Sequence, residues 1–242
     1  RFAAWMGPFE KRFTRTLQGL FLRQKREVVK RLKEALAGRS ARIGPQDAGL
    51  IDVILFDEKG AFDVFKSVGE KFIKDTLIAR GNVEIASLNL DIQFDAARPP
   101  IIEFGKQLST EFATRVNNTT RRQLRHLLTE GINAGETIEQ LAGRVETVYE
   151  HATGFRAIRI ARTVTIGASN AGAQEAYKQG GIEQNGWLTA RDEDVRDLHR
   201  IDGEKVTVGA RFSNGLRYPG DPTGQPGNII NCRCTIVPVV EA

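Results

Sequence analysis

Glycine and proline recur every few residues in the segment 187–234, which constrains the fold more than any other feature of this 242-residue chain. Neither residue suits the interior of a long helix or strand. The segment therefore predicts a compact, turn-rich module with a hairpin turn at Asn214-Gly215 and short strands at residues 205–208 and 235–240. Residues 192–199 begin like a helix capped by Thr189 or Asp192.

Upstream of Gly181 the hydrophobic pattern is helical. Apolar residues recur every three or four positions, as expected for helices with one buried face. The predicted helices cover residues 9–37, 46–56, 61–79, 101–130, 137–149 and 155–178. Thr137 has Gln140 three residues later, which predicts a capping box. Residues 83–94 alternate like extended chain, and residues 116–120, rich in Thr and Asn, weaken their helix.

Glycines and prolines mark the expected element boundaries. The predicted helix ends are Gly38, Gly81-Asn82, Gly131 and Gly180-Gly181, and Pro99-Pro100 begins a helix. We expect an α+β chain whose amino-terminal two thirds are mainly helical and whose carboxy-terminal module is small, antiparallel and turn-rich. The expected domains are residues 1–98, a basic helical region, then 99–181 and 182–242.

Composition excludes several classes of protein. Hydrophobic residues make up 40% and charged residues 27%, as in ordinary globular domains. No apolar run approaches the roughly 20 residues of a membrane span, and no secretory signal is evident. The two cysteines are separated by one residue, so they predict no disulfide framework and favour a reducing compartment.

Positive charge is concentrated near the amino terminus. Between Glu10 and Arg42 eleven basic residues, the last two being Arg39 and Arg42, face three acids. They predict either a solvated helix face or a surface that contacts DNA or an acidic protein. The contact candidates are Arg12, Arg15, Arg23, Lys25, Arg26, Lys30 and Arg31, together with a second basic group, Arg121, Arg122 and Arg125.

Two patterns share the helix at residues 155–178. Arg156, Arg159 and Arg162 recur every three residues along one side. Small residues form a strip that indicates either tight helix packing or a ligand groove; they are Ala161, Ala168, Gly172 and Ala176.

His199, Cys232 and Cys234 are the candidate metal ligands, with three interpretations open. They could hold a structural zinc ion with Asp192 or Asp221 as the fourth ligand, although C-x-C is less typical than C-x-x-C. Alternatively, the cysteines are small buried apolar groups and His199 hydrogen-bonds the loop backbone. A third interpretation is a metal-dependent nuclease or hydrolase in which His199 acts with Asn231 or Asp202.

The carboxy-terminal motifs carry a family resemblance. W-L-T-A-R-D-E-D-V-R-D-L-H-R-I-D-G, R-Y-P-G-D-P and N-C-R-C, after I-A-R-T-V-T-I-G-A-S-N-A-G-A-Q-E-A-Y-K-Q-G-G, resemble the Mu F-like (MuF) phage head-morphogenesis domain over about residues 125–240. Val164 departs from the usual acid of the family's I-A-R-T-E. The signature positions here are Trp187, Asp194, Arg196, His199, Gly203, Pro219, Asn231, Cys232 and Cys234.

The resemblance implies a structural minor head protein of a tailed bacteriophage, without enzymatic activity or cofactor. Such proteins associate with the portal and inner capsid, assist head assembly or DNA delivery, and end in the virion after assembly in the host cytoplasm. The implied partners are the portal protein, the inner capsid and packaged double-stranded DNA, with no membrane. In some phages the domain is fused to the portal polypeptide, and elsewhere it is joined to toxin domains, which leaves an interaction module as a further alternative.

Overall fold

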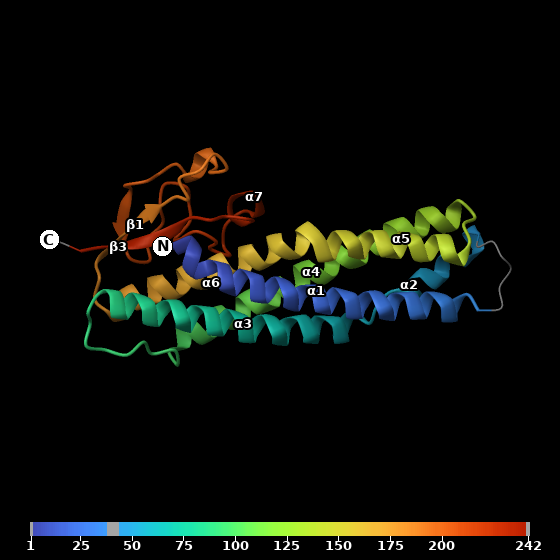
Figure 1. The fold of residues 1–242 in the computed structure, drawn as a ribbon, viewed down its shortest axis with the longest axis horizontal. Coiled ribbons are helices and arrows are strands. Elements are labelled where there is room, and N and C mark those ends of the chain that lie inside the picture. The colour runs from blue at the N-terminus through green and yellow to red at the C-terminus, as the bar shows by residue number, and fades with distance from the viewer. Residues whose placement is uncertain (1, 38–43, 241–242) are drawn as a thin grey trace. The chain divides into compact units, whose positions relative to one another are not determined.

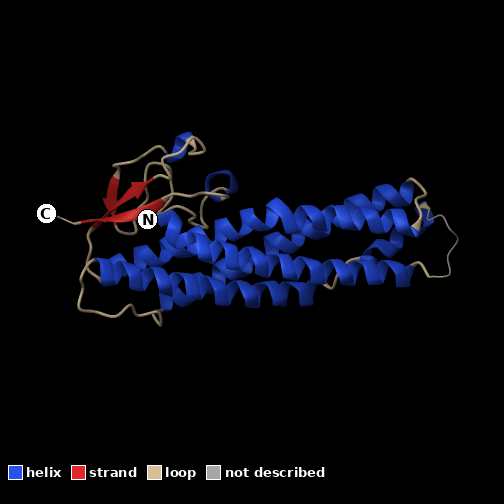
Figure 2. Ribbon diagram, viewed as in Figure 1, coloured by secondary structure: helices blue, strands red, loops and turns tan. Residues whose placement is uncertain are grey.

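Long helices make up most of the chain, and three short strands form one small sheet (Figures 1 and 2). The computed structural model describes residues 2–37 and 44–240. Gly38, Arg39 and Arg42, predicted as a helix end and as basic surface, lie outside the described residues. The long helices are α1 (Phe2–Ala35), α3 (Glu58–Ser87), α4 (Pro99–Asn133), α5 (Ile138–His151) and α6 (Ala157–Gln179). The α+β class is confirmed.

The remaining elements are short. The 3-10 helix η1 (Pro45–Leu50) leads into α2 (Ile51–Ile54), and a π turn labelled η2 (Ala152–Arg156) precedes α6. The carboxy-terminal part holds β1 (Gln184–Leu188), the 3-10 helix η3 (Asp197–His199), β2 (Lys205–Thr207), α7 (Pro226–Ile229) and β3 (Thr235–Val239).

The chain divides into two compact units, and both are discontinuous in sequence. Unit 1 comprises Arg1–Phe13, Val68–Ser109 and Ile158–Ala242, and unit 2 comprises Thr14–Ser67 and Thr110–Ala157. The expected domain boundaries near residues 98 and 181 stay predictions. None of the described helices combines the length and apolar character needed to cross a bilayer.

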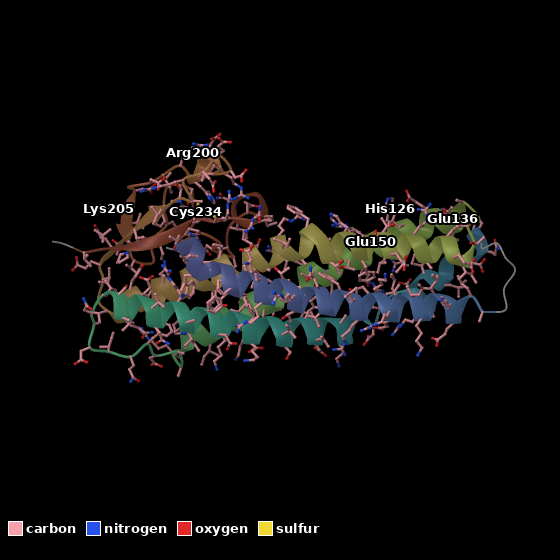
Figure 3. All side chains as sticks on the ribbon, in the orientation of Figure 1. His126, Glu136, Glu150, Arg200, Lys205 and Cys234 are labelled. Carbon is pink, nitrogen blue, oxygen red and sulfur yellow. The ribbon has the colours of Figure 1, made fainter. Side chains whose placement is uncertain are left out.

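Unit 2 is helical and has its own aromatic core. Phe65 packs against Phe21 and Phe112, with ring centroids 5.5 and 6.1 Å apart. The polar stretch 116–120 does not interrupt α4, because Asn117 and Thr120 donate side-chain hydrogen bonds to carbonyl oxygens four residues earlier. His126 on α4 and Glu150 on α5 lie at the surface (Figure 3).

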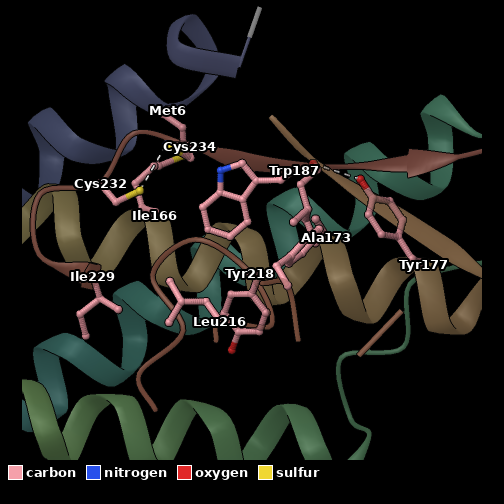
Figure 4. Packing of buried hydrophobic residues seen from close by; sticks show 12 residues of the cluster. Met6, Ile166, Ala173, Tyr177, Trp187, Leu216, Tyr218, Ile229, Cys232 and Cys234 are labelled. Carbon is pink, nitrogen blue, oxygen red and sulfur yellow. Dashed lines mark hydrogen bonds between the residues drawn. The ribbon is translucent and has the colours of Figure 1, made fainter. Parts of the chain in front are cut away.

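Unit 1 combines the sheet with α6 and parts of α1, α3 and α4. The strand order is β2-β1-β3, and both pairs are antiparallel. Trp187 of β1 pairs with Ile236 of β3, and both side chains are buried. Their cluster includes Met6 from α1 and Tyr177 from α6, so segments from both ends of the sequence share one core (Figure 4).

Two glycines predicted as helix ends are instead helix-interior packing positions. At Gly81 a Cβ would collide with the ring of Phe94, and at Gly131 it would collide with Leu141 and Glu136. These neighbours explain why both residues are glycine. Neither glycine ends its helix, since α3 continues to Ser87 and α4 to Asn133. The prediction of extended chain over residues 83–94 is therefore wrong for residues 83–87. The capping box of Thr137 and Gln140 is confirmed.

Three other local predictions need correction. Residues 192–196 are not helical, since Arg196 is extended and the only helical turn there is η3. Residues 46–56 form a 3-10 helix and one α turn rather than a regular helix. The helix expected from residue 155 begins at Ala157, because the backbone of Gly154 leaves helical geometry. The hairpin predicted at Asn214-Gly215 is wrong, because no strand flanks these residues, although Gly215 does occupy a turn with a φ of 81°.

Candidate functional site: a buried histidine and two cysteines

Three soft ligand atoms meet inside the carboxy-terminal module. His199 ends η3, and Cys232 and Cys234 lie just before β3. The Nδ1 atom of His199 is 3.5 Å from the Sγ of Cys232 and 3.7 Å from the Sγ of Cys234. All three residues are at most 3% exposed. The structure therefore brings together the three residues that the sequence predicts as metal ligands.

Asn228 fixes the orientation of the histidine ring. Its Oδ1 lies 2.7 Å from the Nε2 of His199, and its Nδ2 donates to the carbonyl oxygen of Asn214 at 3.2 Å. A carbonyl only accepts, so the amide nitrogen must face Asn214 and the amide oxygen must face the ring. Nε2 is then the protonated nitrogen of the neutral ring, and Nδ1 presents a lone pair to the two sulfurs. The expectation that His199 bonds the loop backbone is wrong, because its partner is a side chain.

Aromatic packing holds the other side of the ring. Trp187 meets His199 edge-on, with ring centroids 5.1 Å apart and an interplanar angle of 74°. Phe212 meets Trp187 in the same way at 5.2 Å. Arg196 donates to the carbonyl oxygen of Ile230, two residues before Cys232. These contacts leave the imidazole little freedom to rotate.

The two cysteines affect each other's ionisation. The Cys232 thiol donates to the Cys234 sulfur, which lowers the pKa of Cys234 even though burial opposes the charge. The same hydrogen bond, together with burial, raises the pKa of Cys232. The backbone N–H of Cys234 also donates to the Cys232 sulfur at 3.4 Å (Figure 4). The lowered pKa of Cys234 favours its thiolate, which is the form that binds metals.

The acids proposed as a fourth ligand are committed to arginines. The buried carboxylate of Asp221 accepts from Arg217 at 2.8 and 2.9 Å and from Thr223. The Asp192 carboxylate lies 2.8 Å from Arg233. Among the described residues, neither acid belongs to the group of ligand atoms around His199, whose members lie within 4.8 Å of one another.

The partners expected for a catalytic histidine are engaged elsewhere. Asp202 accepts from the backbone N–H and the hydroxyl of Thr189 at 3.0 and 2.7 Å. Asn231 accepts from Arg162 at 2.9 Å. Within the described part of the chain, neither side chain hydrogen-bonds His199. The geometry therefore gives no support to the nuclease interpretation.

The other signature residues shape the module. Gly203 has a φ of 90°, and Asn231 has a φ of 61°, so both occupy turn conformations. Asp194 pairs with Arg233 at 2.9 Å on the surface. The carbonyl oxygen of Pro219 accepts from Asn170. Each of these residues either adopts a turn conformation or makes a polar contact within unit 1.

Asn170 joins α6 to the module, a role that sequence analysis missed. The side chain is fully buried, and its amide nitrogen lies within 3.3 Å of the carbonyl oxygens of Ile166, Pro219 and Cys234. Its amide oxygen accepts from the backbone N–H of Ile236 at 3.1 Å. The sequence did hold one signal for this role. Asn170 lies within a strip of small residues, and an Asn on a buried helix face needs several hydrogen-bond partners.

The small-residue strip of α6 is a packing surface. A Cβ at Gly172 would collide with the backbone carbonyl of Leu77, and one at Gly167 would lie 2.8 Å from that of Gly220. The prediction of tight packing is confirmed. Of the three arginines at the start of this helix, Arg162 pairs bidentately with Glu10 at 2.9 to 3.3 Å, and Arg156 is buried.

The predicted basic contact residues divide into two groups. Six have a carboxylate within 4.0 Å; they are Arg12, Lys25, Lys30, Arg31, Arg121 and Arg125. The other four are exposed, and the described residues supply no acidic partner for them; they are Arg15, Arg23, Arg26 and Arg122. The structure therefore leaves part of the predicted basic surface free to meet an acidic partner.

Comparison with known proteins finds a family match over the carboxy-terminal part of the chain. Residues 122–237 match the family model described as "Phage Mu protein F like protein". This part of the chain is similar to the Mu F-like domain of that family. It contains His199, both cysteines and Asn170, whereas most of the amino-terminal basic residues lie outside it.

Two relatives extend the similarity beyond the Mu F-like domain. A protein of Bacillus subtilis (strain 168), "Uncharacterized protein YqbB", is 24% identical over 200 residues, covering 78% of this chain and 64% of the relative. A Haemophilus influenzae (strain ATCC 51907 / DSM 11121 / KW20 / Rd) protein, "Uncharacterized protein", is 25% identical over 155 residues, covering 64% of this chain and 31% of the relative. The chain thus spans less than two thirds of each relative's length. No solved structure is significantly similar.

Proposed function

We propose that the chain is a structural minor head protein of a tailed bacteriophage that associates with the portal and inner capsid. The observation that carries this proposal is the Mu F-like domain over residues 122–237. In this role the protein assists head assembly or DNA packaging and delivery, and it is carried in the virion. Its carboxy-terminal module, residues 182–242, serves as a docking body, because the buried side chains of Asn170 and Asp221 are engaged in hydrogen bonds that hold the module together.

A basic stripe on α1 supports contact with packaged DNA. Five exposed cations fall on one side of this helix, because their spacing follows the 3.6-residue repeat; they are Arg15, Arg23, Arg26, Lys30 and Lys33. From residue 15 to residue 33 the stripe is roughly 27 Å long. A run of this length can neutralise several phosphates of a duplex.

Virion composition tests the head role. We expect the protein in purified particles of the phage or prophage that encodes it, and co-sedimentation of the purified chain with the portal protein. Absence from mature particles together with no sedimentation with portal would contradict the proposal. A portal gene beside the coding sequence would support it independently.

DNA binding is tested separately with a charge-matched control. Replacing Arg15, Arg23, Arg26 and Lys30 by Gln should weaken binding to duplex DNA and reduce the slope of log affinity against log salt by about 3 to 4. The control removes four exposed lysines outside the stripe, Lys59, Lys71, Lys74 and Lys106. Equal losses in both variants would show that only net charge matters, and binding insensitive to salt would exclude phosphate contact.

A further inference from the structure

The three ligand atoms around His199 have the spacing of a metal site. In a tetrahedral zinc site, Zn–S bonds of about 2.3 Å and a Zn–N bond of about 2.05 Å place each sulfur about 3.6 Å from the nitrogen. The observed distances from Nδ1 to Cys232 and Cys234 are 3.5 and 3.7 Å. One cation can therefore reach all three atoms with little movement of the backbone.

The surroundings of the histidine match those of a metal ligand. A ligating imidazole donates its other ring N–H to a neighbouring acceptor, which fixes the ring and raises its basicity. Asn228 accepts that hydrogen bond at 2.7 Å, and Trp187 packs edge-on against the ring. Nδ1 therefore carries the lone pair that would bind a cation, and this nitrogen faces the two sulfurs.

A small cleft leads to the three residues. Its lining includes the exposed carboxylate of Asp194 and the side chain of Asn231 beside the His199 group. A cation held by three protein ligands completes its shell with water or a further oxygen ligand. Since His199, Cys232 and Cys234 all line this small cleft, water can approach the three ligand atoms from it.

We propose that His199, Cys232 and Cys234 bind a zinc-class divalent cation through Nδ1 and two thiolates, with the fourth position open to the cleft. Two thiolates and an imidazole select borderline-soft metals over magnesium or calcium. Binding releases the thiol protons and ties η3 to the chain that enters β3. The ion stabilises the module in this way, since metal-binding free energy adds to folding free energy. This proposal does not depend on the role in head assembly.

Metal content of the full chain tests the proposal. Protein made with added zinc and purified under reducing, chelator-free conditions should contain one zinc per chain by mass spectrometry. After removal of the metal, cobalt(II) should restore one equivalent, with the intense visible bands of tetrahedral cobalt and a thiolate charge-transfer band. Cys232→Ser, Cys234→Ser and His199→Gln should each lose this stoichiometric binding.

Two further variants separate ligation from general damage. Asn228→Leu keeps all three ligands and should weaken affinity about 10- to 100-fold in competition with a chromophoric chelator. His126→Gln changes an exposed histidine of α4 and should leave the metal content unchanged. Asp194→Asn should change the cobalt spectrum if the carboxylate occupies the fourth position and leave it unchanged if water does.

Two results would overturn the proposal. One is wild-type protein that, after zinc loading, carries no more metal than His199→Gln. The other is a cobalt complex without the thiolate band. If the cysteine variants fail to fold, the wild-type chain still decides, because its denaturation in the presence of a metal-sensitive dye must release stoichiometric zinc.

Discussion

Gly167 of α6 and Gly220 of the carboxy-terminal loop pack backbone against backbone. A Cβ built on either residue would lie 2.8 Å from a backbone atom of the other. Such an approach excludes every side chain at both positions, and Gly220 also has a φ of 80°. This contact sets how closely the module approaches the helix within unit 1.

Gly167→Ala is therefore expected to lower the free energy of unfolding by about 1 to 3 kcal/mol, the usual cost of overpacking. Urea denaturation followed by circular dichroism measures the change. Gly105→Ala is the matched control, because Gly105 is also helical and its Cβ would meet open space. The control should be neutral or stabilising by up to about 1 kcal/mol. Equal effects of the two variants would refute the close-contact explanation.

Asn170→Asp should destabilise unit 1 by roughly 3 kcal/mol, because a carboxylate cannot donate to the carbonyls of Pro219 and Cys234. Thermal unfolding near neutral pH measures the loss. The neighbouring hydroxyl of Ser169 is buried and finds no hydrogen-bond partner among the described residues. Ser169→Ala should consequently leave stability unchanged or raise it. A comparable loss in both variants would mean that any change in this part of α6 is harmful.

The ion pair of Asp221 and Arg217 predicts acid sensitivity. Burial alone would raise the pKa of Asp221, but hydrogen bonds from Arg217 and Thr223 outweigh it and hold the pKa below its ordinary value of 3.8. A lowered folded-state pKa contributes stability above the unfolded pKa, and this contribution is lost as pH falls through the folded pKa. The free energy of unfolding should therefore decline below about pH 4, as denaturation curves across this range will show.

Asp221→Asn removes this charge and should cost about 3 kcal/mol at neutral pH. In the variant, the part of the acid-induced loss due to this group should disappear. Asp197→Asn serves as the control, because the Asp197 side chain is fully exposed. An acid profile that is identical in wild type and Asp221→Asn would show that the pair does not govern the loss.

The amino terminus of α5 offers a simpler test. The Thr137 hydroxyl accepts from the backbone N–H of Gln140, and the Gln140 side chain accepts from the backbone N–H of Thr137. Thr137→Ala should reduce stability by about 1 kcal/mol in chemical denaturation. Thr147→Ala, in the interior of the same helix, should be neutral or slightly stabilising, because alanine favours helix. The cap has no measurable role if the two variants cannot be distinguished.

Local chemistry was predictable from the sequence, whereas the consequences of tertiary contacts were not. The capping box of Thr137 depends on residues three apart, so the pattern alone identifies it. Gly81 and Gly131 carry the same local signal as helix-ending glycines, and only the neighbouring Phe94 and Leu141 reveal that they are packing positions. Strand β1 was missed because Gln184–Leu188 holds an Asn and a Gly, and its pairing with β3 comes from distant sequence.

The candidate site shows the same division. Residue type and spacing indicated that His199, Cys232 and Cys234 form one group. Asn228, which orients the imidazole, could not be identified, because an Asn in a turn-rich segment has many possible roles. The fourth-ligand candidates Asp192 and Asp221 were plausible by residue type. In the structure, however, Arg233 pairs with Asp192 and Arg217 pairs with Asp221.

The discontinuity of unit 1 sets an order of events on the ribosome. Every residue of unit 2 precedes Ile158, so the nascent chain can complete that unit while the carboxy-terminal module, residues 182–242, is still untranslated. Met6 and Tyr177, by contrast, share a core with Ile236 of the last strand. The apolar side chains in the first turns of α1 therefore lack this part of their core until β3 has been synthesised.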